Sequence, residues 1–375
     1  MAIADLQTFT GLTDADIDNV ARELDAIRTD VENSRGERDA RYIRRTIVLQ
    51  RALEVAGRLA LTAGSSRAGW WAGAVTLALA KIIENMEIGH NVIHGQWDWM
   101  NDPEIHSSSW EWDMAGSAAH WRFTHNFQHH KYTNVLGMDT DLGYGFLRVT
   151  HEQRWRWHHI GNVLFNAMLT LGFEWGVALQ NSRSEIRKLF TTQDGSARAS
   201  LRQRWSKAIS QVVKDYVAVP LLTALSPRAT VRSTLTANLV ANAIRNAWAY
   251  SVIFCGHFPD GAEKFTEHDV SVEKKGEWYL RQLLGSANIE AGPLLAFLTG
   301  NLCYQIEHHL YPDLPSNRLA EIAVRVQAVC RKYRLPYTSG SFVVQYAQSW
   351  RTVAKLSLPA LGRQRRVRRF GPVVM

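Results

Sequence analysis

The stretch His125-Asn126-Phe127-Gln128-His129-His130 decides how the rest of the chain is interpreted. It places three imidazoles within six consecutive residues. On a helix, residues i and i+4 share one face, and residue i+5 lies about 100° further round. The spacing therefore predicts that His125, His129 and His130 converge on one metal-binding region.

Two more clusters of histidines repeat this helical spacing. One is His90-Asn91-Val92-Ile93-His94, and the other is Gln305-Ile306-Glu307-His308-His309. Seven histidines exceed what one tetrahedral zinc ion binds, so two metal ions fit the number better. Imidazole is a ligand for iron, zinc, copper and nickel, and iron is the redox-active choice that we favour. The six scattered histidines are expected to be surface or core residues: His106, His120, His151, His158, His159 and His268.

Two residues near the clusters have open roles. His257 ends an apolar run, where it is either a further ligand or a cation favoured by a helix C-terminus. Glu87 forms a Glu-x-x-His motif with His90. Bundled di-iron carboxylate proteins use two such motifs, but no second one occurs at a plausible position. Glu87 is therefore expected to orient a histidine rather than to bind metal.

The composition limits the partners and the compartment. The chain has 375 residues, 46% of them hydrophobic, with fourteen tryptophans and a net charge of +8. Tryptophan suits a membrane–water interface, and positive charge favours phospholipid, coenzyme A or an acidic redox protein. Nucleic acid is not expected, because no binding motif accompanies the charge. The three cysteines form no C-x-x-C pair, which argues against an iron–sulfur cluster and favours a reducing compartment.

Helical periodicity runs through the whole chain. Thr13 and Asp16 predict the capped start of an amphipathic helix over residues 12–34. Residues 44–63 carry a polar stripe and predict an interfacial or internally packed helix. The polar, tryptophan-rich residues 95–158 predict a folded aqueous or interfacial part, and residues 316–337 another helix. The N-terminus shows no cleavable signal peptide.

Membrane spans are predicted from apolar length, because a span needs about 20 residues. The candidates are 69–90, 160–182 and 233–256, the second being the best. In the first, Lys81, Glu84 and Glu87 are expected to line the protein interior or the aqueous end of the span. Two crossings between the second and third clusters place the basic stretch 183–232 on the far side, against the positive-inside tendency. A re-entrant segment at 216–227 is the alternative, and the sequence leaves both open.

The pattern H-x-x-x-H, H-x-x-x-H-H, Q-x-x-H-H resembles the integral-membrane fatty acid desaturase family. The resemblance covers about residues 37–355. Segments 83–95, 97–112 and 120–134 and the one after Gly300 are most similar to bacterial stearoyl-CoA Δ9-desaturases. Thr140-Asp141 resembles the acidic loop of the family.

The resemblance implies an all-α, integral-membrane helical fold with a helical cytosolic cap that holds a di-iron site. The implied division is an N-terminal amphipathic segment 1–43, a membrane desaturase domain 44–355 and a basic tail 356–375. The implied ligands of two iron ions are His90, His94, His125, His129, His130, His257, His308 and His309. Gln305 departs from members with histidine there, and is expected to bind metal, hold a water or orient a neighbour.

The implied reaction is the O2-dependent insertion of a double bond into a long-chain acyl-CoA, with stearoyl-CoA and Δ9 favoured. The location implied is the inner cell membrane, among membrane lipids, with the site facing the cytoplasm. The chain has no dinucleotide-binding, iron–sulfur or cytochrome motif, so electrons must come from a separate ferredoxin or flavin/iron–sulfur reductase.

Three other functions stay open from the sequence. An acyl-lipid desaturase and a membrane di-iron fatty acyl hydroxylase share the same histidine pattern. A histidine-rich metal transporter or storage protein is of another class and predicts ionisable residues inside several spans. Here the clusters lie in polar stretches at span ends, which argues against transport.

Overall fold

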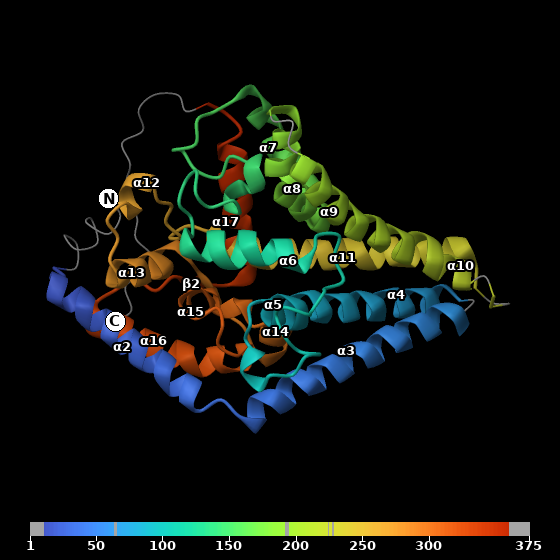
Figure 1. The fold of residues 1–375 in the computed structure, drawn as a ribbon, viewed down its shortest axis with the longest axis horizontal. Coiled ribbons are helices and arrows are strands. Elements are labelled where there is room, and N and C mark those ends of the chain that lie inside the picture. The colour runs from blue at the N-terminus through green and yellow to red at the C-terminus, as the bar shows by residue number, and fades with distance from the viewer. Residues whose placement is uncertain (1–10, 64–65, 192–194, 224, 227–228, 360–375) are drawn as a thin grey trace.

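The computed structural model describes residues 11–63, 66–191, 195–223, 225–226 and 229–359, and its regular structure is almost entirely helical. Within these residues the only sheet is a parallel pair, β1 (Asn288–Ile289) and β2 (Ser339–Gly340). The prediction of an all-α chain is confirmed at this level. The helices form two parts, which we call the arm and the cap (Figure 1).

The arm consists of two long helical hairpins. The first is α3 (Glu37–Ala63) with α4 (Arg67–Ile82), and the second is a run of helix followed by α11 (Val231–His257). That run comprises α9 (Gly195–Val213), η6 (Lys214–Ala218) and α10 (Val219–Thr223). Helix α4 packs against both α3 and α11. Contacts between Trp70 and Ser233, and between Ser226 and Thr62, join the hairpins at the end that lies on the right of Figure 1.

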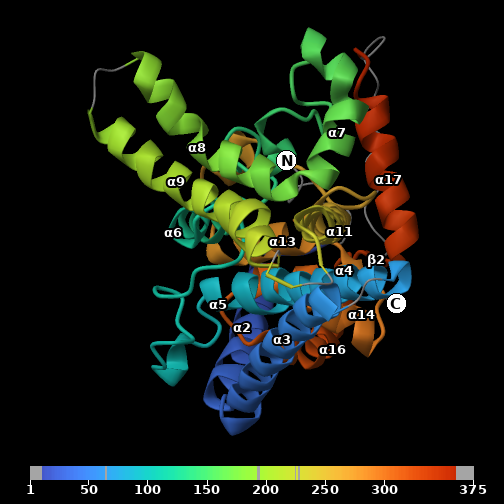
Figure 2. The same ribbon diagram turned by 90° about the vertical axis from the view of Figure 1, so that its right-hand side faces the viewer.

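The second hairpin corrects the prediction for residues 183–232. Most of the described residues in this stretch form helices rather than a basic loop, and the re-entrant segment at 216–227 stays a prediction. Helix α8 (Phe173–Thr191) is followed by α9, and the chain then enters the arm through η6 and α10 (Figure 2). The reason is that apolar side chains recur between the basic residues, and Leu201 and Ala208 of α9 are buried. The basic side chains of this stretch therefore lie mainly on helices rather than on a loop.

Within the described residues, no single helix combines the length and the apolar character that a membrane crossing needs. The run predicted as a span over 160–182 is not one continuous helix. The required length and apolar character are reached only by two helical segments taken together, Trp157–Leu171 and Phe173–Gln180. These two segments meet at a bend of 105°. The bend falls at Gly172, between α7 (Asn162–Leu171) and α8.

Buried charges in and beside the arm are paired with each other. The Nζ of Lys81 lies 2.7 Å from Oδ2 of Asp113 and 3.0 Å from Oδ2 of Asp215. The Nη2 of Arg245 lies 2.7 Å from Oε1 of Glu174. The expectation that Lys81, Glu84 and Glu87 face the interior is confirmed, since all three are buried.

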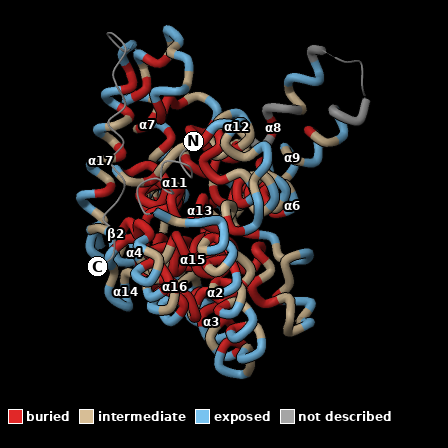
Figure 3. The backbone as a smooth tube through the Cα atoms, turned by 90° about the vertical axis from the view of Figure 1, so that its left-hand side faces the viewer, coloured by how far each residue is buried: buried red, intermediate tan, exposed pale blue. Residues whose placement is uncertain are grey.

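The cap is built around α2 (Asp14–Asn33), α13 (Lys275–Gly285), α15 (Gln305–Leu310) and α16 (Leu319–Tyr333). Helix α2 packs against α13 and α16, and its apolar stripe is buried. The predicted capping box is present, with Thr13 and Asp16 bonded reciprocally. Burial is densest where α11, α13 and α15 meet (Figure 3). The site lies in this region.

The remaining elements connect the arm to the cap. Helix α17 (Phe342–Lys355) packs against α7 and α11. The predicted folded part 95–158 has short elements and buries Trp97, Trp112 and Trp121. The other elements are η1 (Ile83–His90), α5 (Asn91–Ile93), η2 (Asp98–Met100), α6 (Ala118–Trp121), η3 (Arg122–His129), η4 (Leu142–Gly145), η5 (Trp157–Gly161), α12 (Glu267–Val270), α14 (Pro293–Leu298), η7 (Leu302–Tyr304) and η8 (Ser316–Arg318).

The division at residues 43–44 falls inside the continuous helix α3, and the division into domains stays a prediction. The arginine-rich part of the tail, from Arg363 to Arg369, lies outside the described residues.

Candidate metal centre

Two π-helical segments carry the first two histidine clusters. The first, η1, continues α4 and ends at His90, and His94 follows α5. The second, η3, contains His125 and His129 and is followed by His130. Hydrogen bonds from i to i+5 widen a π-helical turn, and such turns often occur at functional sites. The wider turn places the i+4 and i+5 histidines on either side of the first one.

Four histidines form the first group. One ring nitrogen each from His90, His94, His125 and His308 lies within 4.8 Å of the others. All four residues are buried. They come from the end of η1, the residue after α5, the middle of η3 and the last turn of α15. The first group therefore brings together all three sequence clusters.

Three histidines form the second group, again with nitrogens within 4.8 Å of one another: His129, His257 and His309. The Nε2 atoms of His257 and His309 lie 3.2 Å apart. His257 is the last residue of α11, so the arm delivers it directly to the cap. Of the two roles open from sequence for His257, the geometry favours a place in the cluster.

His130 lies between the two groups. Its ring centroid is 4.7 Å from that of His94, 4.9 Å from His308 and 4.4 Å from His309. Neither of its ring nitrogens has a hydrogen-bond partner among the described residues. All eight predicted histidine ligands thus meet in one cluster, and the six scattered histidines belong to none of its groups.

Carboxylate and amide side chains on the outer side of the cluster hold several imidazole rings in place through hydrogen bonds at Nδ1. Asp139 lies 3.0 Å from Nδ1 of His129, and Asp141 lies 2.8 Å from Nδ1 of His125. Asn91 lies 3.0 Å from Nδ1 of His90. A bond at Nδ1 turns Nε2 toward the centre of the cluster, which is how such partners orient metal-binding histidines. From the sequence we singled out Asp141 but not Asp139. The pattern Asp-x-Asp, which begins nine residues after His130, could have pointed to both carboxylates.

Burial favours the neutral form of most of the clustered imidazoles, and His129 is the exception. Burial lowers the pKa of His130 and His308 well below the usual range, and neighbouring imidazoles lower it further. Burial also opposes the charge of His129, but the Asp139 carboxylate beside it outweighs this and raises the pKa. Neutral imidazoles are the form that binds metal ions.

Gln305 lies at the second group. Its Nε2 is 3.0 Å from Nε2 of His257, and its Oε1 is buried without a hydrogen-bond partner. The absence of a side chain at Gly256 leaves room for the Gln305 side chain, because a Cβ at position 256 would lie 2.8 Å from Cγ and Cδ of Gln305. The amide therefore sits where a further ligand or an orienting group would be placed.

Glu87 is not placed as predicted. Its carboxylate accepts hydrogen bonds from Tyr42 at 2.8 Å, Ser316 at 2.6 Å and Asn301 at 3.0 Å. None of these partners is a histidine. The side chain instead joins α3, η1 and η8, which ties the arm to the cap just below His90.

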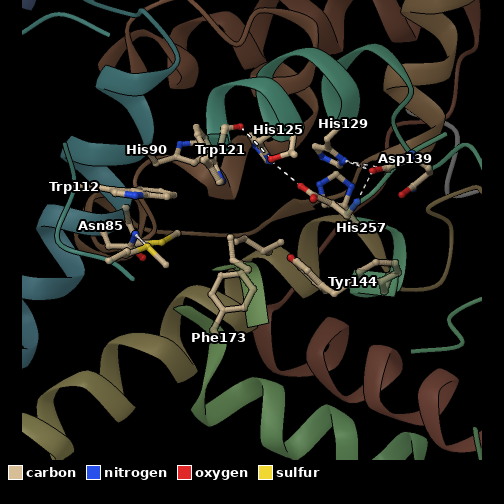
Figure 4. A pocket seen from close by; sticks show the side chains of 18 residues that line it. Asn85, His90, Trp112, Trp121, His125, His129, Asp139, Tyr144, Phe173 and His257 are labelled. Carbon is tan, nitrogen blue, oxygen red and sulfur yellow. Dashed lines mark hydrogen bonds and ion pairs between the residues drawn. The ribbon is translucent and has the colours of Figure 1, made fainter. Parts of the chain in front are cut away.

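An enclosed cavity runs along the histidines. Its wall includes His90 and His125 of the first group and His129 and His257 of the second. The opposite wall is apolar, with Phe173 and Tyr144 facing the histidines in Figure 4, and Trp112 at one end. The cavity therefore offers apolar contacts on one side and imidazole nitrogens on the other, and its volume in this structure is about 40 Å³.

A second, more open cavity adjoins the first, because Tyr144 lines both. Its volume is about 930 Å³. Its wall combines apolar residues of α7 and α8 with Arg154, Arg156 and His158.

This fold and this cluster coincide with a known class of enzyme. The family model described as fatty acid desaturase matches residues 68–341, which include all eight clustered histidines. The chain belongs to the fatty acid desaturase family and is an oxidoreductase of lipid metabolism.

Comparison with individual relatives shows which desaturases the chain is similar to. The chain is 69% identical over 361 residues to the NADPH-dependent stearoyl-CoA 9-desaturase of two Mycobacterium tuberculosis strains, covering 96% of this chain and 84% of the relative. It is 23% identical over 289 residues to the sn-1 linoleoyl-lipid 6-desaturase of a Synechocystis strain, covering 71% and 74%. The Delta(5) fatty acid desaturase A of Dictyostelium discoideum is 24% identical over 281 residues, covering 70% and 58%.

Proposed function

We propose that this protein is an O2-dependent di-iron desaturase that inserts a Δ9 double bond into stearoyl-CoA. The observation that carries the proposal is the enclosed apolar cavity along two groups of buried histidines. The identity of 69% to a stearoyl-CoA 9-desaturase over nearly the whole chain supports the choice of substrate.

The donor set supports two metal ions, one for each group. Among the described residues, His94 and His125 each leave Nε2 buried without a hydrogen-bond partner, and His130 and His308 leave both ring nitrogens so. An unpaired buried polar atom is costly, and a metal ion would satisfy one nitrogen of each ring. In the second group, the Nε2 atoms of His257 and His309 face each other at 3.2 Å. With all-imidazole groups and an O2-dependent reaction, iron is the ion that we propose. The proposed ligands are His90, His94, His125 and His308 for one ion and His129, His257 and His309 for the other, with His130 between them.

The reaction balances as R–CH2–CH2–R′ + O2 + 2e⁻ + 2H⁺ → R–CH=CH–R′ + 2H2O. The iron pair, when bound, would supply the oxidising power that breaks an unactivated C–H bond. The chain's own residues bind the alkyl chain, exclude water and hold the imidazoles. Phe173 and Tyr144 press the chain toward the histidines, and Asp139 and Asp141 keep Nε2 of their histidines aimed at the centre.

The open cavity is the proposed entrance for the CoA ester. Arg154 and Arg156 on its wall would meet the CoA phosphates, since guanidinium groups bind phosphate strongly. Tyr144 marks the passage from this entrance to the alkyl cavity. Acyl-CoA therefore fits better than a lipid-linked chain, which is the alternative suggested by the more distant lipid desaturase.

The arm is the proposed membrane-embedded part. Its outer faces expose large apolar side chains, and extended exposed apolar surface marks a lipid or protein contact. They include Val48, Val55, Leu59, Trp71, Val75, Ile209, Val217, Leu221, Leu222, Leu239 and Ile244. The hairpin ends at the right of Figure 1 lie far from the cap, which would face the cytoplasm.

The experiment supplies membranes that contain the protein with stearoyl-CoA, NADPH and a ferredoxin with its reductase. Product analysis should show oleate as the new chain, with the double bond at position 9. A hydroxylated product without an alkene would contradict desaturation, and a product found only in phospholipid would favour the acyl-lipid alternative. Metal analysis that finds zinc alone, without O2 consumption, would support the transport or storage alternative.

A further inference from the structure

Two phenylalanines are exposed on the segment that carries the second histidine cluster. Phe123 and Phe127 of η3 are 56% and 52% exposed, and their rings stack with centroids 5.8 Å apart. His125 and His129 alternate with them and point inward, where they are buried. The outer surface of η3 is therefore aromatic directly behind the proposed ligands.

Positive charge flanks this aromatic pair. The ammonium group of Lys131 lies 5.3 Å from the ring centroid of Phe127. The guanidinium group of Arg122 donates to the carbonyl oxygen of Ser107. Within the described part of the chain, neither cation forms an ion pair with a carboxylate. We call Arg122, Phe123, Phe127 and Lys131 the aromatic patch.

The composition of the patch is typical of a protein interface. Aromatic residues and arginine are enriched at interface cores and carry much of the binding energy. The exposed apolar residues of the arm are different, because most of them are aliphatic and spread along helices, as a lipid surface requires. The patch instead is small, rigid and charged at its edge, which favours a folded acidic partner.

The position of the patch indicates which partner. Phe127 lies two residues from both His125 and His129, so a protein seated there is separated from the proposed metal positions by one helical layer. The reaction consumes two electrons from outside, and the chain contains no motif for a flavin, an iron–sulfur cluster or a nicotinamide cofactor. This step rests on the proposed function.

We propose that the aromatic patch is the docking surface for an acidic [2Fe–2S] electron donor. Each reduced donor molecule gives up one electron and is oxidised, so two molecules dock in turn for each double bond. The phenyl rings supply the buried core of the contact, and Arg122 and Lys131 attract carboxylates at its rim.

The first test measures binding and needs no turnover. The protein in phosphatidylcholine nanodiscs is immobilised, and an oxidised acidic plant-type [2Fe–2S] ferredoxin is titrated over it. The double variant Phe123→Ser/Phe127→Ser should bind at least about tenfold more weakly, as expected for central aromatic residues. Lys131→Glu should weaken binding and flatten its dependence on salt.

The matched control is Val324→Ser/Val343→Ser, which removes two apolar side chains on α16 and α17 that are more exposed than the two phenylalanines. It should bind ferredoxin like the wild type. Equal binding by the patch variant and the wild type would overturn the proposal, and so would a wild type that does not bind ferredoxin. A patch variant that keeps its ferredoxin affinity but is lost from the membrane fraction would show that the patch contacts lipid instead.

A second measurement separates this proposal from the proposed function. Wild type reduced with dithionite and given stearoyl-CoA and O2 should form oleate in a single turnover. If it forms none, the proposed function fails, whatever the patch binds. The patch variant should form oleate after dithionite reduction but be reduced at least about tenfold more slowly by ferredoxin; equal rates would overturn the docking proposal.

Discussion

The cap and the arm both bury many polar side chains, but they satisfy them in different ways. In the arm, Lys81 and Arg245 each have a carboxylate within ion-pair distance. In the histidine cluster, where the arm meets the cap, His130 and His308 have no hydrogen-bond partner on either ring nitrogen among the described residues. Single atoms such as Nε of Arg245 are also unpaired in the arm, but each of its buried charges keeps an oppositely charged partner. An imidazole without any partner inside the protein is more typical of a ligand-binding site than of a structural ion pair.

The largest effect should follow from removing a histidine of the cluster. We expect His129→Ala to lower desaturation by more than about 100-fold, because substitutions of the outer partners alone cost about 10–100-fold. Bound iron and oleate formation in purified membranes measure this. The amount of protein should stay the same, and retained activity would remove His129 from the proposed ligands.

In the arm, breaking one ion pair should lower stability rather than chemistry. Arg245→Met leaves Glu174 buried without its partner, so we expect a loss of about 3–5 kcal/mol in unfolding free energy. Thermal unfolding in detergent measures it. The double variant Arg245→Met/Glu174→Leu should recover most of the loss, and iron bound per folded molecule should be unchanged. A double variant as unstable as the single one would contradict the pairing argument.

A residue behind the histidines should have an intermediate effect. Asp139→Asn keeps the shape but weakens the acceptor at Nδ1 of His129, so we expect metal affinity to fall about 10–100-fold. Competition with a chelator measures the affinity. Asp18→Asn on the exposed face of α2 is the control and should change nothing. An unchanged affinity in Asp139→Asn would mean that packing alone orients the ring.

The smallest effect is expected at Gln305. A neutral hydrogen bond contributes about 0.5–1.5 kcal/mol, so Gln305→Ala should weaken metal binding by less than about tenfold. The same competition assay applies, with Gln305→His as the comparison that restores an imidazole. A loss as large as that of His129→Ala would show that the amide oxygen itself binds metal.

The convergence of the histidines was predictable because their spacing is local. Their arrangement in groups was not, since His125 lies with His90, His94 and His308, and His129 lies with His257 and His309, although both also approach Asp141. That arrangement depends on the π-helical turn and on which imidazoles of α15 and α11 arrive opposite, and both are tertiary properties. Asp139 escaped notice for a similar reason, because only the loop after His130 brings it back to His129.

The arm shows the limits of reading spans from apolar length. Residues 160–182 form the most apolar run, but Gly172 allows a bend that no hydropathy window detects. Residues 195–213 carry four basic side chains and entered no predicted span, although their helix leads into the second hairpin of the arm. Helix pairing, rather than apolar length, decided which segments form the arm.

The short helix α15 gives one histidine to each group, His308 to the first and His309 to the second. The helices of the arm all precede α15, so a growing chain contains the arm before it contains either of these imidazoles. Because His308 and His309 are adjacent, both groups gain their last histidine within one helical turn. A chain truncated before α15 would therefore lack a histidine of each group.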